Sequence, residues 1–320
     1  MMAYCSGYIC GYAARLYVVR TPMNAPAPAP VWNITRGQLV LDRPLVMGIV
    51  NLTPDSFSDG GSFGSEREAL VRCERLLAEG ADILDLGAES TRPGSSGVNE
   101  REELARLMPV LRQAVRLGAP VSVDTSKTAV MQAALEVGAD IINDVAALAA
   151  PGALLAVAQH GRCGVCLMHM HGEPRSMQAS PMQGDAVPQV LEFFRDALRR
   201  VQGAGIAAER IVLDAGIGFG KTPVQNFALV ARQRELLTAG RPLLVGFSRK
   251  SSLAHVIEQY TGTAAPPPAG RLGASVAAAL LAAERGASIV RVHDVRATVQ
   301  ALAIWQAMRD VEELGEGEQA

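Results

Sequence analysis

The 320-residue sequence contains few aromatic residues and no long hydrophobic segment. Aromatic side chains make up 4% of the chain. No apolar run approaches the ~20 residues that a membrane-spanning helix needs, so no membrane partner is expected. Lysine and arginine number 30 and aspartate and glutamate 32, so charge predicts no nucleic-acid partner either. What remains is a globular protein rich in small and aliphatic residues.

The five cysteines form neither an even set nor a regular pattern. A chain of this length can fold on its core alone, so the cysteines favour a reducing cytoplasm over a disulfide framework. Cys163 and Cys166 form a CxxC motif, and His169 and His171 follow it, which are the residue types of a zinc site. On an extended strand the two cysteines would point to opposite faces, so we favour ordinary buried thiols.

Both ends of the chain differ in composition from its centre. Residues 1–35 contain no acidic residue, two arginines and the proline–alanine segment NAPAPAP. We expect a flexible extension there; a start at Met23 and a targeting peptide are the alternatives, and the latter lacks a clean basic-then-apolar order. Residues 36–310 are expected to form one catalytic domain, and residues 311–320 an acidic tail.

From residue 45 onward, short apolar runs alternate with amphipathic segments such as 100–117, 186–202 and 298–308. The echo EGADIL, VGADII and RGASIV places a glycine where a helix is expected to end before the next strand. Eight such units predict an α/β fold, a single-domain (β/α)₈ TIM barrel. An open doubly wound sheet is the alternative, but no early dinucleotide fingerprint supports it. The predicted strands are Leu45–Val50, Asp82–Leu86, Val121–Val123, Asp140–Ile142, Gly164–Met168, Arg210–Leu213, Leu243–Gly246 and Ser288–Val292.

Polar residues follow every predicted strand. A barrel brings all eight carboxyl ends to one mouth, where catalytic groups lie. Helix N-capping accounts for Thr125, Ser126 and Thr222. It does not account for a mixture of acids, amides and cations, which suits a phosphorylated heterocycle with hydrogen-bonding edges. The residues of that mixture are Asn51, Asp124, Asn143, Asp214, Lys250, Arg291 and His293.

The segment AGIGFGKT, residues 215–222, nearly matches a phosphate-binding P-loop. It has alanine in place of the first glycine and follows the sixth predicted strand, with no obvious acidic partner strand. Nucleotide triphosphate binding is therefore a weak alternative.

Several motifs resemble those of dihydropteroate synthases, in order, from about residue 45 to the last helix. The most specific are NLTPDSFSDGG (51–61), ESTRPG (89–94), GFSRKS (246–251) and RVHDV (291–295). The resemblance implies a TIM barrel, usually a homodimer, in folate biosynthesis. It would join (7,8-dihydropterin-6-yl)methyl diphosphate to 4-aminobenzoate and release pyrophosphate. The other matching motifs are SVDTSK (122–127), IIND (141–144), CLMHMHG (166–172) and GFGK (218–221).

The chemistry of that reaction fits the residue types. Loss of pyrophosphate from a carbon beside an electron-rich pterin gives a stabilised cation, which an arylamine can capture. Such an enzyme must hold the ring, neutralise the leaving group and exclude water. By resemblance, Asp124, Asn143 and Asp214 would bind the pterin edge, with Met168 and Phe219 as apolar walls.

The resemblance also implies how the diphosphate is held. Arg291, His293, Thr91 and Arg92 would bind it, together with Mg²⁺ held through Asn51.

A third set of residues would serve the second substrate. Phe57, Asp59 and Pro93 lie on two loops that would close, with Ser248, over 4-aminobenzoate, and sulfonamides would compete there. Lys250 should contact both substrates. By resemblance the catalytic residues are Lys250, Asp59, Arg291 and His293.

Two other functions share the barrel and the pterin cradle. A pterin-binding methyltransfer module would not need the two loop motifs or the lysine of GFSRKS, which are present. A non-catalytic pterin-binding paralogue should have lost Arg291, His293 or Lys250, and all three are present.

Overall fold

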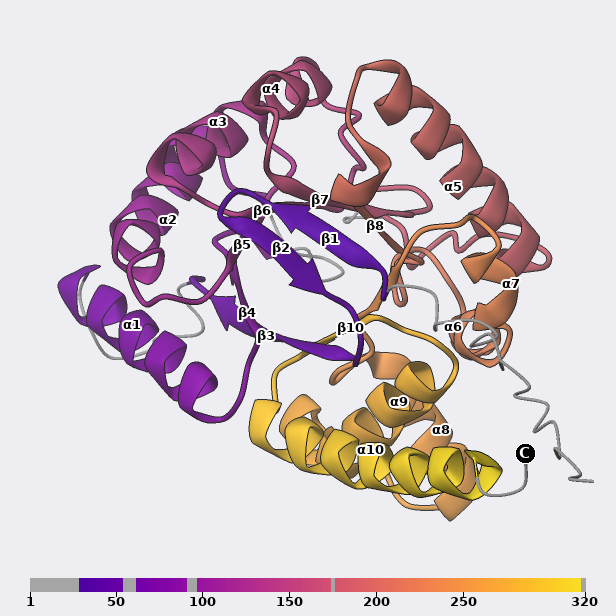
Figure 1. Ribbon diagram of the computed structural model, residues 1–320. Coiled ribbons are helices and arrows are strands. Elements are labelled where there is room, and N and C mark those ends of the chain that lie inside the picture. Colours follow the sequence, from indigo (N-terminus) through magenta and orange to yellow (C-terminus); the bar gives the residue numbers. More distant parts are fainter. Residues whose placement is uncertain (1–28, 54–61, 91–96, 174–175, 318–320) are drawn as a thin grey trace, which may run out of the picture.

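The computed structural model describes residues 29–53, 62–90, 97–173 and 176–317. Eight parallel strands close into a barrel in the order β10-β3-β4-β5-β6-β7-β8-β9. Figure 1 looks along this barrel and shows the helices arranged around it. The fold is the expected TIM barrel, and all eight predicted strands are confirmed. The barrel strands are β3 Leu45–Asn51, β4 Ile83–Gly87, β5 Val121–Asp124, β6 Ile141–Asp144, β7 Gly164–Met168, β8 Ile211–Asp214, β9 Leu243–Val245 and β10 Ile289–Val292.

Helices follow the barrel strands along the chain. The three predicted amphipathic segments fall in α2, α5 and α10. Within the described ranges, none of the helices combines the length and the apolar character needed to cross a bilayer. The helices are α1 Ser62–Ala78, α2 Glu100–Ala114, α3 Thr128–Val137, α4 Ala153–His160, α5 Ala186–Gly203, α6 Pro223–Ala231, α7 Gln233–Leu237, α8 Ser251–Thr261, α9 Leu272–Glu284 and α10 Val295–Gly317.

Alternation along the strands separates two hydrophobic cores. In β4, Leu84 and Leu86 belong to the core between sheet and helices, whereas Ile83 belongs to the cluster inside the barrel. Successive side chains of a strand point to opposite faces, so Asp85 shares the interior face with Ile83. The same alternation places Cys163 in the outer core and Cys166 in the inner one. The two thiols of the CxxC motif therefore lie on opposite faces, as predicted.

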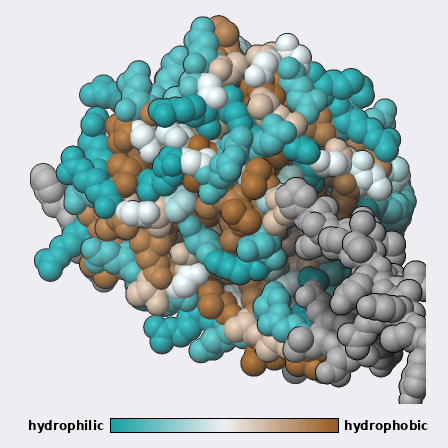
Figure 2. Space-filling view, in the orientation of Figure 1, coloured by the Kyte–Doolittle hydropathy of each residue, from teal (hydrophilic) through white to brown (hydrophobic). Residues whose placement is uncertain are grey.

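A β-hairpin that the sequence did not predict covers the amino end of the barrel. β1 Val31–Ile34 pairs antiparallel with β2 Gly37–Val40, and the hairpin crosses the barrel in Figure 1. Trp32 is fully buried in the inner cluster, and its Nε1 donates to the carbonyl of Arg210 at 3.0 Å. The surface of this face mixes hydrophilic residues with smaller hydrophobic areas (Figure 2).

The expectation of a flexible extension therefore does not hold for residues 31–34. They are ordered because the apolar side chains of Trp32 and Ile34 cover the inner core. At the other end, α10 continues to Gly317 and so includes most of the expected acidic tail. The division into segments 1–35, 36–310 and 311–320 otherwise stays a prediction.

Helix termini agree with the sequence in part. Thr222 caps α6 in a capping box with Gln225, as expected. The N-cap position of α3 is Lys127, without a side-chain cap, so the capping role expected for Thr125 and Ser126 is wrong. Thr125 Oγ1 instead accepts a hydrogen bond from the Lys127 N–H at 3.3 Å, which stabilises the turn before the helix.

Candidate active site

Acidic, amide and guanidinium groups from four strands meet inside the carboxyl end of the barrel. Arg291 on β10 donates from Nε to Asp85 Oδ2 at 2.6 Å and from Nη2 to Asp124 Oδ2 at 2.7 Å. Asn143 Nδ2 donates to the same Asp85 oxygen at 3.4 Å. Asp85 is fully buried, and its Oδ1 has no hydrogen-bond partner among the described residues. Asp124, by contrast, is partly exposed, so its carboxylate is the one of the pair that a ligand's donors can reach.

Asp214 completes the acidic lining from β8. Its Oδ1 accepts a hydrogen bond from the Gly216 N–H at 2.8 Å, and its backbone carbonyl accepts one from the His169 N–H. Burial raises the pKa of the Asp214 carboxyl, although the Gly216 N–H and nearby cations oppose the shift. The carboxylate is therefore held at a defined position on the barrel wall.

The acids and the arginine perturb one another. Burial, opposed by Arg291 and assisted by Asp85, raises the pKa of Asp124 to about 7. Burial alone would lower the pKa of Arg291, but the carboxylates of Asp85 and Asp124 outweigh it and raise that pKa. Two carboxylates thus compete for one guanidinium, and perturbed groups of this kind cluster at functional sites.

An apolar wall stands beside this polar cluster. Met168 at the end of β7 and Phe219 in the loop after β8 pack together in one small buried cluster. The Lys250 ammonium lies 4.4 Å from the centroid of the Phe219 ring. A flat heterocycle can lie against this wall while its edge meets the acids.

The loop that resembles a P-loop has a structural role. A Cβ on Gly216 would lie 1.8 Å from the His169 carbonyl oxygen, and one on Gly220 would lie 2.1 Å from that of His171. Only glycine permits this close approach. Lys221 is 1% exposed, and its ammonium donates to the carbonyls of His169, Gly216 and Phe219. The lysine is thus bound to backbone and does not extend to a phosphate.

Ser248 and His293 connect the loops after the last two strands. Ser248 Oγ lies 3.0 Å from His293 Nδ1 and accepts a hydrogen bond from the His293 N–H at 3.2 Å. Lys250 occupies the N-cap position of α8 without a side-chain cap, so capping does not explain it. The structure therefore brings together Ser248, His293, Lys250 and the strand residues at one mouth.

Some expected site residues lie outside the described ranges: Phe57, Asp59, Thr91, Arg92 and Pro93. The described residues on either side of 91–96 are nonetheless held by hydrogen bonds. Glu89 Oε2 accepts from Lys127 Nζ at 2.6 Å, and Glu89 Oε1 accepts from the Val98 N–H at 3.0 Å. Lys127 also pairs with the fully buried Glu103 carboxylate at 2.6 Å. A single carboxylate thus ties together the two sides of the segment that begins at Thr91.

Asn51 ends β3 at the mouth and is partly buried. No group of three or more histidine, cysteine, aspartate or glutamate side chains in the described part of the chain could hold a metal. One amide oxygen fits Mg²⁺ that takes its other ligands from substrate phosphates and water, as this ion commonly does.

Asp85 is the main site residue that the sequence reasoning missed. It lies within the predicted strand Asp82–Leu86, whereas that reasoning considered the polar residues that follow each strand. A carboxylate flanked by Leu84 and Leu86 in a strand buried on both faces was the available signal. The structural role of Lys221 was also not predicted, because the segment that contains it was considered only as a weak nucleotide-binding alternative.

Fold and site together define a pterin-binding barrel enzyme, and a comparison with protein families agrees. The model of a family described as pterin binding enzyme matches residues 47–293. Dihydropteroate synthase from Neisseria meningitidis serogroup B is 48% identical over 283 residues, covering 87% of this chain and 97% of its own length. That of Escherichia coli is 45% identical over 276 residues, covering 86% and 95%.

Solved structures agree with the sequence relatives. Dihydropteroate synthase from Xanthomonas albilineans, determined with 4-aminobenzoic acid, is 46% identical with a TM-score of 0.81, covering 88% of this chain and 98% of its own. The Yersinia pestis enzyme in a sulfonamide drug complex is 45% identical with the same TM-score, covering 88% and 99%. The chain therefore belongs to the dihydropteroate synthase family.

Proposed function

We propose that this enzyme joins (7,8-dihydropterin-6-yl)methyl diphosphate to 4-aminobenzoate, forming 7,8-dihydropteroate and pyrophosphate in folate biosynthesis. The observation that carries the proposal is the set of acids and an amide inside the barrel mouth beside an apolar wall. Asp124, Asn143 and Asp214 supply hydrogen-bonding groups, and Met168 and Phe219 supply the wall.

The pterin binds deepest in the site. Its amino-pyrimidine edge presents adjacent donors, which a carboxylate accepts in pairs. Asp124 and Asp214 are such acceptors, and Asn143 can both donate and accept. Lys250, held over the Phe219 ring, lies where it can contact the pterin and the second substrate.

The leaving diphosphate lies nearer the mouth. Arg291 and His293 bind it, assisted by Thr91 and Arg92. The Arg291 guanidinium has five N–H donors, and its bonds to Asp85 and Asp124 use two of them. When bound, Mg²⁺ supplies positive charge to the departing pyrophosphate, and Asn51 is the residue that would hold it.

The 4-aminobenzoate pocket is formed by residues of two loops and of the turn after β9. Phe57, Asp59 and Pro93 contribute from the loops, and Ser248 from the turn. Asp59 belongs to the catalytic set with Lys250, Arg291 and His293. Sulfonamides resemble 4-aminobenzoate in shape and charge, so they compete for this pocket.

Exposed apolar side chains support a homodimer. Six of the ten exposed large hydrophobic side chains in the described ranges lie on α8, α9 and α10. These three helices are neighbours at one side of the barrel in Figure 1. A cluster of exposed apolar residues is typical of an interface between subunits. The six residues are Tyr260, Leu272, Leu281, Ile304, Met308 and Val311.

A cytoplasmic location is the remaining part of the proposal. Cys73, Cys163 and Cys166 are free and buried. Burial raises the pKa of the Cys73 thiol to about 11. Unreactive, reduced thiols suit a reducing compartment.

A coupled assay of pyrophosphate release tests the activity. Purified enzyme with Mg²⁺ and both substrates should release one pyrophosphate for each dihydropteroate formed. Omission of 4-aminobenzoate should abolish dihydropteroate formation. Release of pyrophosphate without any dihydropteroate, or no turnover with both substrates, would contradict the proposed reaction.

A further inference from the structure

Arg249 lies between Ser248 and Lys250 in an uncommon backbone conformation. Its φ is 60°, in the left-handed region that favours glycine. Within the described ranges, Ala147 and Leu148 are the only other non-glycine residues with positive φ. Strain of this kind persists where surrounding contacts hold it, and it is concentrated at functional sites.

Contacts to two separate parts of the molecule hold Arg249. Its N–H donates to Ser275 Oγ at 3.0 Å, and its carbonyl accepts from Arg271 Nη1 at 2.7 Å. These bonds tie the backbone to the start of α9. The guanidinium donates from Nε to Asp294 Oδ2 at 3.0 Å and from Nη2 to Asp294 Oδ1 at 2.5 Å. The side chain is therefore tied to the loop after β10.

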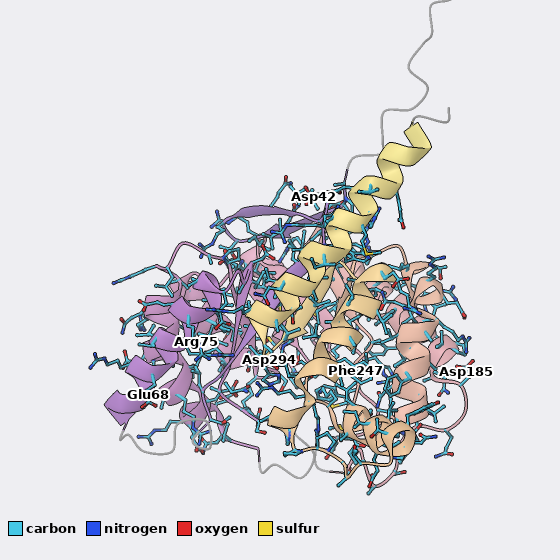
Figure 3. All side chains as sticks on the ribbon, turned by 90° about the horizontal axis from the view of Figure 1, so that it is seen from below. Asp42, Glu68, Arg75, Asp185, Phe247 and Asp294 are labelled. Carbon is cyan, nitrogen blue, oxygen red and sulfur yellow. The ribbon has the colours of Figure 1, made fainter. Side chains whose placement is uncertain are left out.

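Asp294 is itself well anchored next to His293. Its carbonyl accepts from the Thr298 N–H at 3.1 Å at the start of α10. The His293 carbonyl accepts from Arg72 Nη2 of α1 at 2.7 Å. Figure 3 shows Asp294 within the helical layer, away from the hairpin end where Asp42 lies. The Arg249 side chain thus joins a turn with an unusual backbone to a loop that has little freedom to move.

The two loops so joined carry groups of the proposed site. Ser248 bonds to both the ring and the backbone N–H of His293. Lys250, on the other side of Arg249, lies over Phe219. The left-handed backbone conformation of Arg249 therefore determines how the neighbouring side chains of Ser248 and Lys250 are oriented.

We propose that the Arg249–Asp294 ion pair is a clamp that positions His293 at the leaving diphosphate, with Ser248 and Lys250 beside it. Arg249 is a positioning residue, because its guanidinium is committed to Asp294. The side chains are 32% and 19% exposed, so water screens the pair only in part. The inference rests on the proposed function, since it concerns the end of the site that holds the diphosphate.

Two substitutions separate the backbone effect from the clamp. Arg249→Ala removes the ion pair and leaves a Cβ at positive φ, whereas Arg249→Gly removes the ion pair and relieves the backbone. Both should lower kcat by about 10- to 100-fold, because small misplacement of reacting groups slows the chemical step. The glycine variant should unfold at a higher urea concentration than the alanine variant.

The opposite end of the barrel offers a matched control. Arg43 forms the same two-bonded pair with Asp82, at 3.1 and 2.6 Å. Arg43→Ala removes a comparable ion pair without touching the mouth, and it should leave kcat and both KM values unchanged. A loss of activity in this variant similar to that of Arg249→Ala would show a general stability effect and overturn the clamp.

Binding measurements supply a readout that general destabilisation would not move. Affinity for pyrophosphate with Mg²⁺ should fall about tenfold in Arg249→Gly. Affinity for a pterin without a diphosphate should stay within about twofold of wild type, because Asp124, Asn143 and Asp214 on β5, β6 and β8 are unchanged. Equal losses for both ligands, or none for pyrophosphate, would overturn the proposal.

A double-mutant cycle tests the pair itself. Asp294→Asn keeps a capping residue before α10 and removes the charge. The double variant Arg249→Ala/Asp294→Asn should lower kcat by a factor much smaller than the product of the factors measured for the two single variants. Guanidinium ion should partly restore turnover to Arg249→Gly, and urea at the same concentration should not. Multiplicative effects together with no rescue would refute a clamp.

The proposed reaction and the clamp fail differently. A wild-type enzyme without turnover would refute the reaction, whereas the clamp concerns the ratio of variant to wild type. Pyrophosphate affinity and the ordering of the unfolding midpoints can be measured in both cases.

Discussion

The two ends of the barrel use the same eight strands for opposite purposes. At the amino end, the interior is filled by apolar side chains such as Met47, Ile83 and Leu244, and the hairpin closes it with Trp32. At the carboxyl end, the interior carries Asp85, Asp124, Asn143, Asp214 and Arg291. Apolar packing at the amino end stabilises the fold, whereas the carboxyl end holds buried polar groups, of which Asp85 Oδ1 has no partner among the described residues.

The contrast has a physical reason. Apolar side chains in the closed end gain from every contact and need no partner. Buried charges need compensation, and here one guanidinium serves two carboxylates. Among the described residues at the carboxyl end, Asp85 Oδ1 is left without a hydrogen-bond partner, so substitutions at the two ends should separate stability from activity.

The largest effect is expected at the closed end. Trp32→Ala removes a fully buried indole and its hydrogen bond to the Arg210 carbonyl. Unfolding free energy should fall by about 3–5 kcal/mol. Urea denaturation measures the loss, and kcat of the folded variant at low temperature should match wild type. A stability within experimental error of wild type would show that the hairpin does not contribute to the core.

At the open end, Arg291→Met should affect the rate most. Removal of a cation at the developing pyrophosphate should lower turnover by about 10²–10³-fold. Steady-state pyrophosphate release measures it, with Arg43→Ala as a control that removes an arginine at the closed end. Turnover within about threefold of wild type would remove Arg291 from the leaving-group site.

Loss of a single acid should weaken pterin binding, whereas the residues of the catalytic set stay in place. Asp214→Ala should cost about 1–3 kcal/mol of pterin affinity, because donors of the ring lose their acceptor. Calorimetry with a pterin lacking the diphosphate measures this directly. Unchanged affinity would mean that Asp214 does not face the ring.

The smallest effect is a pH dependence. The pKa of Asp124 is about 7, and the ring donors require its ionised form, so binding must release a proton at lower pH. Pterin affinity should be constant above pH 7 and fall by up to about tenfold for each unit below it. Asp124→Asn should bind more weakly and lose this slope. A wild-type affinity that is flat from pH 5 to about 8 would contradict the raised pKa.

The sequence by itself determined the barrel and most of its mouth. Apolar runs such as Leu45–Val50, each followed by a polar residue, are local patterns, and a closed parallel sheet is the fold that brings their ends together. That is why the sequence alone assigns Asp124, Asn143, Asp214 and Lys250 to one site. The roles of the residues outside the described ranges, such as Phe57 and Arg92, remain predictions from motif resemblance.

Only the tertiary structure decided which charges meet. Arg291 lies 206 residues from Asp85 and 167 from Asp124, and no local pattern determines such pairs. The hairpin likewise was not predicted, because its short strands have no alternation strong enough to distinguish them from a linker, and their burial depends on the amino end of the barrel, which they cover. The left-handed conformation of Arg249 has the same origin, since contacts from α9 and Asp294 hold a backbone that its own sequence disfavours.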